Sequence, residues 1–235
     1  MYSKKEEIFH GIWKYSDVFT QDLNLINRIE SEVEKEEFSW RKGTVGLDAE
    51  YPEYRDCYDL KLSRLGKSHP LYQDIYNAQV PCVDDYCKMY TIEMNYWEWT
   101  NIVKYGPGQH FQEHADHGWS YVSTVSLVGY PNDNYEGGDL YFPKLNVTIK
   151  PKAGDLYIFP SAYIYSHVAR PVLSGTKYCF ATMLDYNDDA HSKEFEEYLD
   201  KKYNKEKRLI ECCQMPNCFI QVLLFIEMFL ATLMS

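Results

Sequence analysis

Short, evenly spaced turns constrain the fold of this chain more than any other feature of its sequence. From Trp97 to residue 185, clusters of Gly, Pro, Asn, Asp or Ser recur, and each is followed by an apolar or β-branched run. In the second half these clusters are residues 131–134, 136–139, 152–155 and 174–175. Because these residue types favour tight turns, the runs between them are predicted to be strands. The fold class is therefore mainly β with supporting α-helices, as a sandwich or barrel.

Composition agrees with a β-rich domain. The chain has 22 tyrosines, and aromatic residues make up 16% of it, which fits sheets and pocket walls better than a helical bundle. A length of 235 residues suits one domain with an appendage. Apolar spacing predicts amphipathic helices over 18–38 and 190–208. The expected organisation is a helix and strand support (1–96), a core (97–188), a closing helix (189–208) and an apolar tail of unknown role (209–235).

Charge and cysteine content narrow the partners and the compartment. A formal net charge of −11 disfavours nucleic acid and would suit a basic partner. The first residues lack the apolar stretch of a secretory signal, and the cysteines include no CxxC pair, so a cytoplasmic location is expected. The run 218–234 is apolar apart from Gln221, Glu227 and Thr232 but is shorter than the roughly 20 residues that span a bilayer. A packing helix is favoured there over a membrane anchor.

Three residues in the β-rich half have the chemistry of metal ligands. His114 and Asp116 are two residues apart, so in a strand both side chains would face the same side, with Ala115 facing away. His167 follows the strand predicted at 155–159. In a barrel rich in hairpins, a neighbouring strand could bring it close to His114 and Asp116. Two histidines and one carboxylate leave positions open on non-haem Fe(II) for a co-substrate and O₂. We therefore expect an iron site.

Lys177 is the candidate for holding an anion beside that metal. It comes ten residues after His167, and this even spacing would let both face the interior if the turn at 174–175 keeps the register. A buried ammonium group requires an anionic partner. The distal carboxylate of 2-oxoglutarate would be such a partner.

Two other functions fit parts of the same sequence. His110, Glu113 and His114 match the HxxEH pattern of inverted zinc peptidases, in which Glu113 would be the general base. That pattern requires a helix, and Gly118 and the β-branched run after it leave room for only a short one. A module that keeps the fold but binds without catalysis is the second alternative.

Residues 97–185 resemble the 2-oxoglutarate and Fe(II) dioxygenases of the prolyl 4-hydroxylase type. The motifs that carry the resemblance are residues 104–109, 114–116, 135–143, 149–156, 166–167, 170–172 and 175–178. The resemblance implies a double-stranded β-helix, the cupin-like jelly roll. It also implies iron held by His114, Asp116 and His167 and 2-oxoglutarate held by Lys177, with further contacts from Tyr105 and from Thr124 or Ser126.

The reaction implied by this resemblance is hydroxylation of a C–H bond, with a prolyl residue of a peptide or protein as the favoured target. O₂ would be consumed, succinate and CO₂ released, and L-ascorbate (vitamin C) would serve as auxiliary reductant. Phe111 departs from the pattern, because the family often has Tyr three residues before the first iron histidine. Residues 129–131 also depart from it. No residue before 97 could be assigned to the substrate channel.

Overall fold

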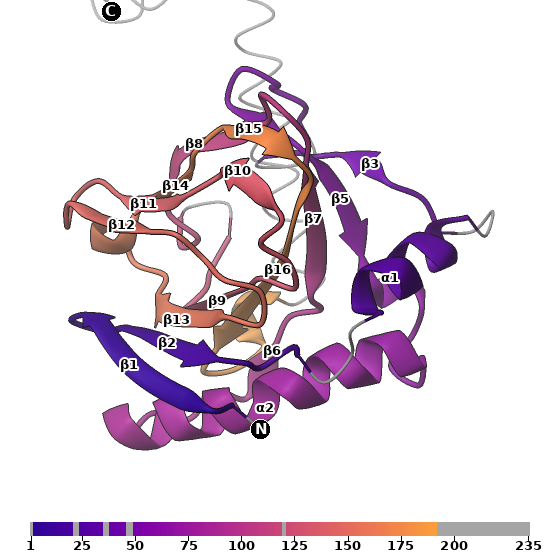
Figure 1. Ribbon diagram of the computed structural model, residues 1–235. Helices are drawn as coiled ribbons and strands as arrows, with labels where there is room; N and C mark the ends of the chain where they lie inside the picture. The colour runs from indigo at the N-terminus through magenta and orange to yellow at the C-terminus, as the bar shows by residue number, and fades with distance from the viewer. Residues whose placement is uncertain (1, 21–23, 35–37, 46–48, 119–120, 192–235) are drawn as a thin grey trace, which may run out of the picture. The chain divides into compact units, whose positions relative to one another are not determined.

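Two antiparallel sheets face each other in the computed structural model, which describes residues 2–20, 24–34, 38–45, 49–118 and 121–191 (Figure 1). The larger sheet has the order β1 (Lys4–Phe9), β2 (Ile12–Ser16), β13 (Leu156–Pro160), β9 (Val125–Gly129), β16 (Lys177–Asp185), β7 (Asn101–Tyr105), β5 (Tyr58–Lys61) and β3 (Arg41–Lys42), with β6 (Tyr96–Trp97) beside β16. The smaller sheet has the order β12 (Val147–Ile149), β11 (Leu140–Phe142), β14 (His167–Ala169), β8 (His110–His114) and β4 (Arg55–Asp56). A ribbon of β10 (Tyr135–Gly137) and β15 (Val172–Gly175) completes this arrangement.

Side-chain alternation along the larger sheet divides the core into two parts. On β16, Tyr178 and Phe180 belong to the cluster that packs against the helices. Cys179 lies between them in sequence and belongs to the cluster inside the barrel, which also contains Phe142 from the smaller sheet and Phe159 from the larger. Because successive residues of a strand face opposite sides, one sheet provides a wall for both clusters.

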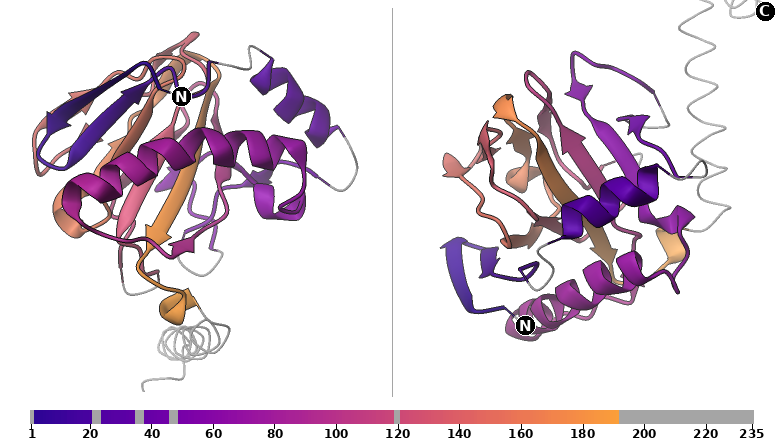
Figure 2. Two further views of the ribbon diagram at one scale, coloured as in Figure 1. Left: turned by 90° about the horizontal axis from the view of Figure 1, so that it is seen from below. Right: turned by 45° about the vertical axis from the view of Figure 1, so that its right-hand side comes forward.

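Two helices cover the outer face of the larger sheet (Figure 2). The longer helix, α2 (Pro70–Tyr90), begins with Pro70, and the His69 side chain accepts a hydrogen bond from Leu71 N–H. It ends at Thr91, which has the left-handed conformation. No element was predicted for these residues. The shorter helix is α1 (Leu25–Val33), and the 3₁₀ turns are η1 (Leu62–Arg64), η2 (Tyr163–Tyr165) and η3 (Asp189–His191).

The N-terminal third differs from the sequence prediction in two respects. Individual strands were predicted only from Trp97 onwards, but the first strands begin at Lys4, because β1 and β2 form a hairpin that extends the larger sheet. β1 is an exposed edge rich in Lys and Glu, a composition that discourages edge-to-edge association but conceals the strand pattern. Within the described part of 18–38, the predicted helix is found as α1, and the N–H of Val18 bonds to Gly154 O at 2.7 Å outside any helix.

The C-terminal predictions fall largely outside the described residues. Residues up to Asp188 form one compact unit, and a second begins at Asp189, of which only η3 is described. The closing helix predicted to residue 208 and the apolar tail from 209 therefore remain predictions. Within the described ranges, none of the helices combines the length and the apolar character needed to cross a membrane.

Gly129 tests the packing between the larger sheet and the segment before α1. A Cβ atom at this position would lie 2.5 Å from Cε2 of Phe19, whose ring packs edge-to-face on Phe180. Gly129→Ala should therefore lower the free energy of unfolding by about 1–3 kcal/mol in urea denaturation. Gly118→Ala is the matched control, because a Cβ there meets nothing within 4 Å. Equal unfolding midpoints for the two variants would contradict this packing.

Candidate metal centre

The smaller sheet brings the two predicted histidine ligands together. His114 is the last residue of β8 and His167 the first of β14, and the two are directly paired across the strands. Their rings are 4.3 Å apart between centroids. Asp116 lies just beyond β8, with carboxylate oxygens 3.7 Å from Nε2 of His114 and 3.9 Å from Nε2 of His167. One ligand atom from each residue lies within 4.8 Å of the others, which is the compactness a shared metal ion requires.

Backbone carbonyls orient both imidazoles. Nδ1 of His114 lies 2.8 Å from Gln112 O, and Nδ1 of His167 lies 3.2 Å from Tyr165 O. Since a carbonyl oxygen only accepts, Nδ1 is the protonated nitrogen in each ring and the lone pair of Nε2 is available to a metal. Burial, followed by the proximity of His167, lowers the pKa of His114 to about 3, so this ring is neutral, as a metal ligand must be.

Asp116 provides the test of whether a metal fits. Its Oδ2 atom is buried and has no hydrogen-bond partner among the residues that the structure describes, which is uncommon for a carboxylate oxygen. Oδ2 lies near Nε2 of His167 and the other carboxylate oxygen, Oδ1, lies near Nε2 of His114, so all three candidate donors face one another without a proton between them. A cation would complement this arrangement, and two histidines with one carboxylate are the donor set of non-haem Fe(II) with open positions. The residues therefore fit an iron ion.

A bulge in β8 aims His114 inward. Between β8 and β14, His167 pairs with His114 and Ala169 pairs with Phe111, so β8 has one more residue than its partner over this stretch. Gln112 and Glu113 are both exposed as a result. We expected His114 and Asp116 to lie in one strand, but β8 ends at His114 and Asp116 belongs to the following loop. The two ligands are therefore oriented by the bulge and by this loop, and strand alternation alone does not orient them.

The zinc-peptidase alternative is wrong, because its motif lies in a strand and not in a helix. The His110 ring contacts Gly108 O and Glu53 O at 3.3 Å each. The Glu113 carboxylate accepts hydrogen bonds from Lys144 at 2.5 Å and from Ser166 at 2.7 Å. Glu113 therefore cannot serve as general base beside His114.

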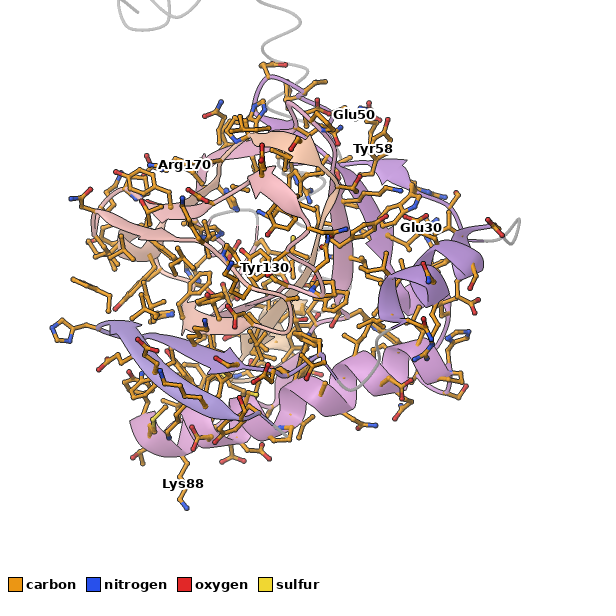
Figure 3. All side chains as sticks on the ribbon, viewed as in Figure 1. Glu30, Glu50, Tyr58, Lys88, Tyr130 and Arg170 are labelled. Atoms are coloured by element: carbon orange, nitrogen blue, oxygen red, sulfur yellow. The ribbon has the colours of Figure 1, made fainter. Side chains whose placement is uncertain are left out.

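Lys177 is buried inside the barrel, as expected, although for a different reason. His167 and Lys177 lie on β14 and β16, in opposite sheets, so their even spacing does not determine their common orientation. Nζ donates to Gly138 O at 2.6 Å and lies 5.2 Å and 5.3 Å from the ring centroids of Tyr105 and Tyr130. Figure 3 shows Tyr130 inside the ring of strands. Burial lowers the pKa of Lys177, and no carboxylate of the described residues forms an ion pair with it.

Tyr135 is a candidate contact that the sequence prediction missed. Its hydroxyl is buried and has no hydrogen-bond partner within the described part of the chain. Gly138 allows it to approach the lysine, because a Cβ there would lie 3.0 Å from Cδ of Lys177 and 3.2 Å from Cε2 of Tyr135. A tyrosine placed just before a Gly-Gly turn was the available signal. Two neighbouring buried donors with few acceptors indicate an anion site.

Thr124 does not join this group. Its hydroxyl donates to the Asp185 carboxylate at 2.6 Å, and its N–H bonds to Leu184 O. Thr124 therefore lies at the far end of β16, about 26 Å along the strand from Lys177 at the usual rise per residue. Ser126 pairs with Ser161 at 2.7 Å between hydroxyl oxygens. Of the predicted contacts to 2-oxoglutarate, only Tyr105 is near Lys177.

Comparison with known proteins agrees with this geometry. Residues 100–184 match the model of the 2OG-Fe(II) oxygenase superfamily. The "Putative prolyl 4-hydroxylase" of Acanthamoeba polyphaga mimivirus is 29% identical over 136 residues, with a coverage of 48% of this chain and 52% of that protein. The chain thus spans about half the length of this curated relative.

Solved structures share the fold at low sequence identity. A viral collagen prolyl hydroxylase from Paramecium Bursaria Chlorella virus-1, in a 2OG complex, is 19% identical with a TM-score of 0.56, covering 74% of this chain and 95% of its own. A Trichoplax adhaerens prolyl hydroxylase, in complex with a hypoxia inducible factor peptide fragment, has 17% identity, a TM-score of 0.62 and coverage of 75% and 84%. A Pseudomonas putida prolyl-4-hydroxylase has 17% identity, a TM-score of 0.60 and coverage of 75% and 93%. The predicted double-stranded β-helix is thereby confirmed, and residues 100–184 are similar to the 2OG-Fe(II) oxygenase superfamily, with prolyl 4-hydroxylase-like relatives.

Proposed function

We propose that this chain is an Fe(II) and 2-oxoglutarate dependent dioxygenase that hydroxylates a prolyl residue in a peptide or protein. One observation carries the proposal: a group of two histidines and a carboxylate shares the barrel interior with a buried lysine that has no carboxylate partner among the described residues. The balanced reaction consumes 2-oxoglutarate, O₂ and a C–H bond. It yields succinate, CO₂ and the alcohol.

Each residue has a separable role in this reaction. His114, Asp116 and His167 would hold the iron through Nε2, a carboxylate oxygen and Nε2. When bound, iron supplies the redox chemistry that couples decarboxylation of 2-oxoglutarate to insertion of oxygen into the target bond. The rings of Phe142 and Phe159 lie 5.6 Å and 5.1 Å from that of His167 and keep water from this side of the site.

Lys177 would bind the distal carboxylate of 2-oxoglutarate. A buried ammonium is costly without an anion, and a charge-assisted hydrogen bond to a carboxylate offsets that cost. The walls formed by Tyr105 and Tyr130 favour the cation through their ring faces, and the Tyr135 hydroxyl offers a second donor. The chain thus holds the co-substrate from the end remote from the metal.

The substrate class rests on similarity and on charge. One structural relative is titled a collagen prolyl hydroxylase, and another is in complex with a hypoxia inducible factor peptide fragment. The net charge of −11 on this chain would favour a basic peptide over nucleic acid. Ascorbate as auxiliary reductant is proposed on the family resemblance alone. Cytoplasmic residence is likewise a proposal, supported by the free thiols of Cys57, Cys82, Cys87 and Cys179.

Succinate release tests the reaction class. Purified protein with Fe(II), 2-oxoglutarate and ascorbate under air should release succinate, whereas His114→Ala should release none, because one ligand is lost. His10→Ala, on the exposed β1–β2 hairpin, is the matched control and should retain parental turnover. A parent that binds iron and 2-oxoglutarate yet forms no succinate, even with cell extract, would indicate the non-catalytic binding module instead.

Direct binding of 2-oxoglutarate by calorimetry tests the anion site. Lys177→Met should raise the Kd by about 10- to 100-fold, since a hydrogen bond to a charged group is lost. Tyr135→Phe should raise it by about tenfold, and Tyr163→Phe, whose ring is 77% exposed, should not change it. Binding of 2-oxobutyrate, which lacks the distal carboxylate, should be insensitive to Tyr135→Phe. Equal loss for both keto acids would contradict the assignment.

Mass spectrometry of peptides tests the target residue. Proline-containing peptides, in basic and acidic versions, should gain one oxygen atom on proline when incubated with the protein, and the basic version should react faster. The gain should disappear when proline is replaced by alanine. Oxygen found only on another residue, or only on a free amino acid, would refute the prolyl assignment but keep the reaction class.

A further inference from the structure

Arg55 is a partly buried cation that the proposed reaction does not use. It lies on β4, directly opposite Phe111 of β8. Its guanidinium donates to Thr44 O at 2.5 Å and to the Asp59 carboxylate at 2.7 Å, while its Nε atom is buried without a partner within the described residues. The guanidinium carbon lies 4.8 Å from the centroid of the Phe111 ring, so this ring is its aromatic neighbour.

The Phe111 ring in turn lies parallel to the imidazole of His114. Their centroids are 3.5 Å apart and their planes differ by 12°. Residues three apart on a regular strand face opposite sides, so this contact exists only because the β8 bulge turns both side chains the same way. Tyr54 supports the bulge, since its hydroxyl donates to Glu113 O at 2.7 Å and its ring meets Phe111 edge-on.

A single hydrogen bond at Nδ1 does not determine the plane of an imidazole. The ring of His114 can still tilt about the Nδ1 to Gln112 O direction, which would swing Nε2 away from Asp116. A parallel aromatic ring at van der Waals distance removes this freedom. The Arg55 guanidinium is held in place by the hydrogen bonds that it donates to Thr44 O and to the Asp59 carboxylate. It then fixes the Phe111 ring by packing against it.

We propose that Phe111 and Arg55 are positioning residues for His114, acting as a stack that fixes the imidazole plane for metal binding. The proposal rests on the proposed function in so far as His114 is a metal ligand. Neither residue belongs to the group of candidate metal ligands. Support of this kind around a metal ligand commonly changes metal affinity by about 10- to 100-fold when removed.

Co(II) affinity, measured by competition with a chelator, tests the stack without turnover. Phe111→Leu keeps an apolar side chain but loses the flat ring, and should weaken Co(II) binding by about tenfold or more. Phe111→Tyr retains the ring and should bind as the parent does. Arg55→Met should also weaken binding, and Arg55→Lys should restore only part of the loss, because an ammonium lacks the planar fork. The matched controls are Phe9→Leu, on the exposed hairpin, and Arg28→Met, on α1.

The Co(II) ligand-field absorption spectrum provides a second readout that a purely structural role would not move. It should shift for Phe111→Leu and stay parental for Phe111→Tyr and both controls. Parental affinity and an unchanged spectrum in Phe111→Leu would overturn the proposal. If that variant does not fold, Arg55→Met decides: reduced affinity supports the stack, and parental affinity overturns it. If the parent protein binds Co(II) but releases no succinate with Fe(II), the proposed function is refuted. The Co(II) affinities and spectra of the variants still decide this inference in that case.

Discussion

The candidate site depends on one cross-strand pair, His114 opposite His167, where β8 and β14 run side by side in the smaller sheet. Antiparallel pairing brings these residues to a centroid separation of 4.3 Å although they are far apart in the sequence. The backbone carbonyls that receive their Nδ1 protons belong to the same two strand ends. If this pair slipped by one residue, each imidazole would face the other side of the sheet, and no later adjustment of Asp116 could restore the group.

Two polar groups buried in the barrel interior lack a matching partner among the described residues. One is the Oδ2 atom of Asp116, an acceptor to which no described residue donates, and the other is the ammonium of Lys177, which the described residues provide with a carbonyl but no carboxylate. Burying a charged group without a partner is costly, and buried groups of this kind are typical of functional sites. A cation at Asp116 and an anionic co-substrate at Lys177 would relieve both costs.

The sequence prediction named the three residues that the structure brings together, but only part of their geometry. The prediction that His114, Asp116 and His167 lie together came from their order among Gly-rich turns. Such turns, and the strands between them, can be recognised from a few neighbouring residues. The predicted alternation between His114 and Asp116 was wrong in detail, since β8 ends at His114 and Asp116 belongs to the following loop. Thr124 was placed beside the co-substrate by its position after the motif, yet its hydroxyl is engaged by Asp185 at the other end of β16.

The sequence by itself determined the β-rich class, the strands after residue 97 and the candidate ligand set, because turn residues, apolar runs and metal-ligand chemistry can be recognised over short windows. The tertiary structure alone decided that the charged residues of β1 form an edge strand, that Tyr135 lies near Lys177, and that Arg55 stacks on Phe111 beside His114. Each of these depends on which distant residues become neighbours and on how completely water is excluded between them. No local pattern contains that information, because burial and pairing are properties of the whole folded chain.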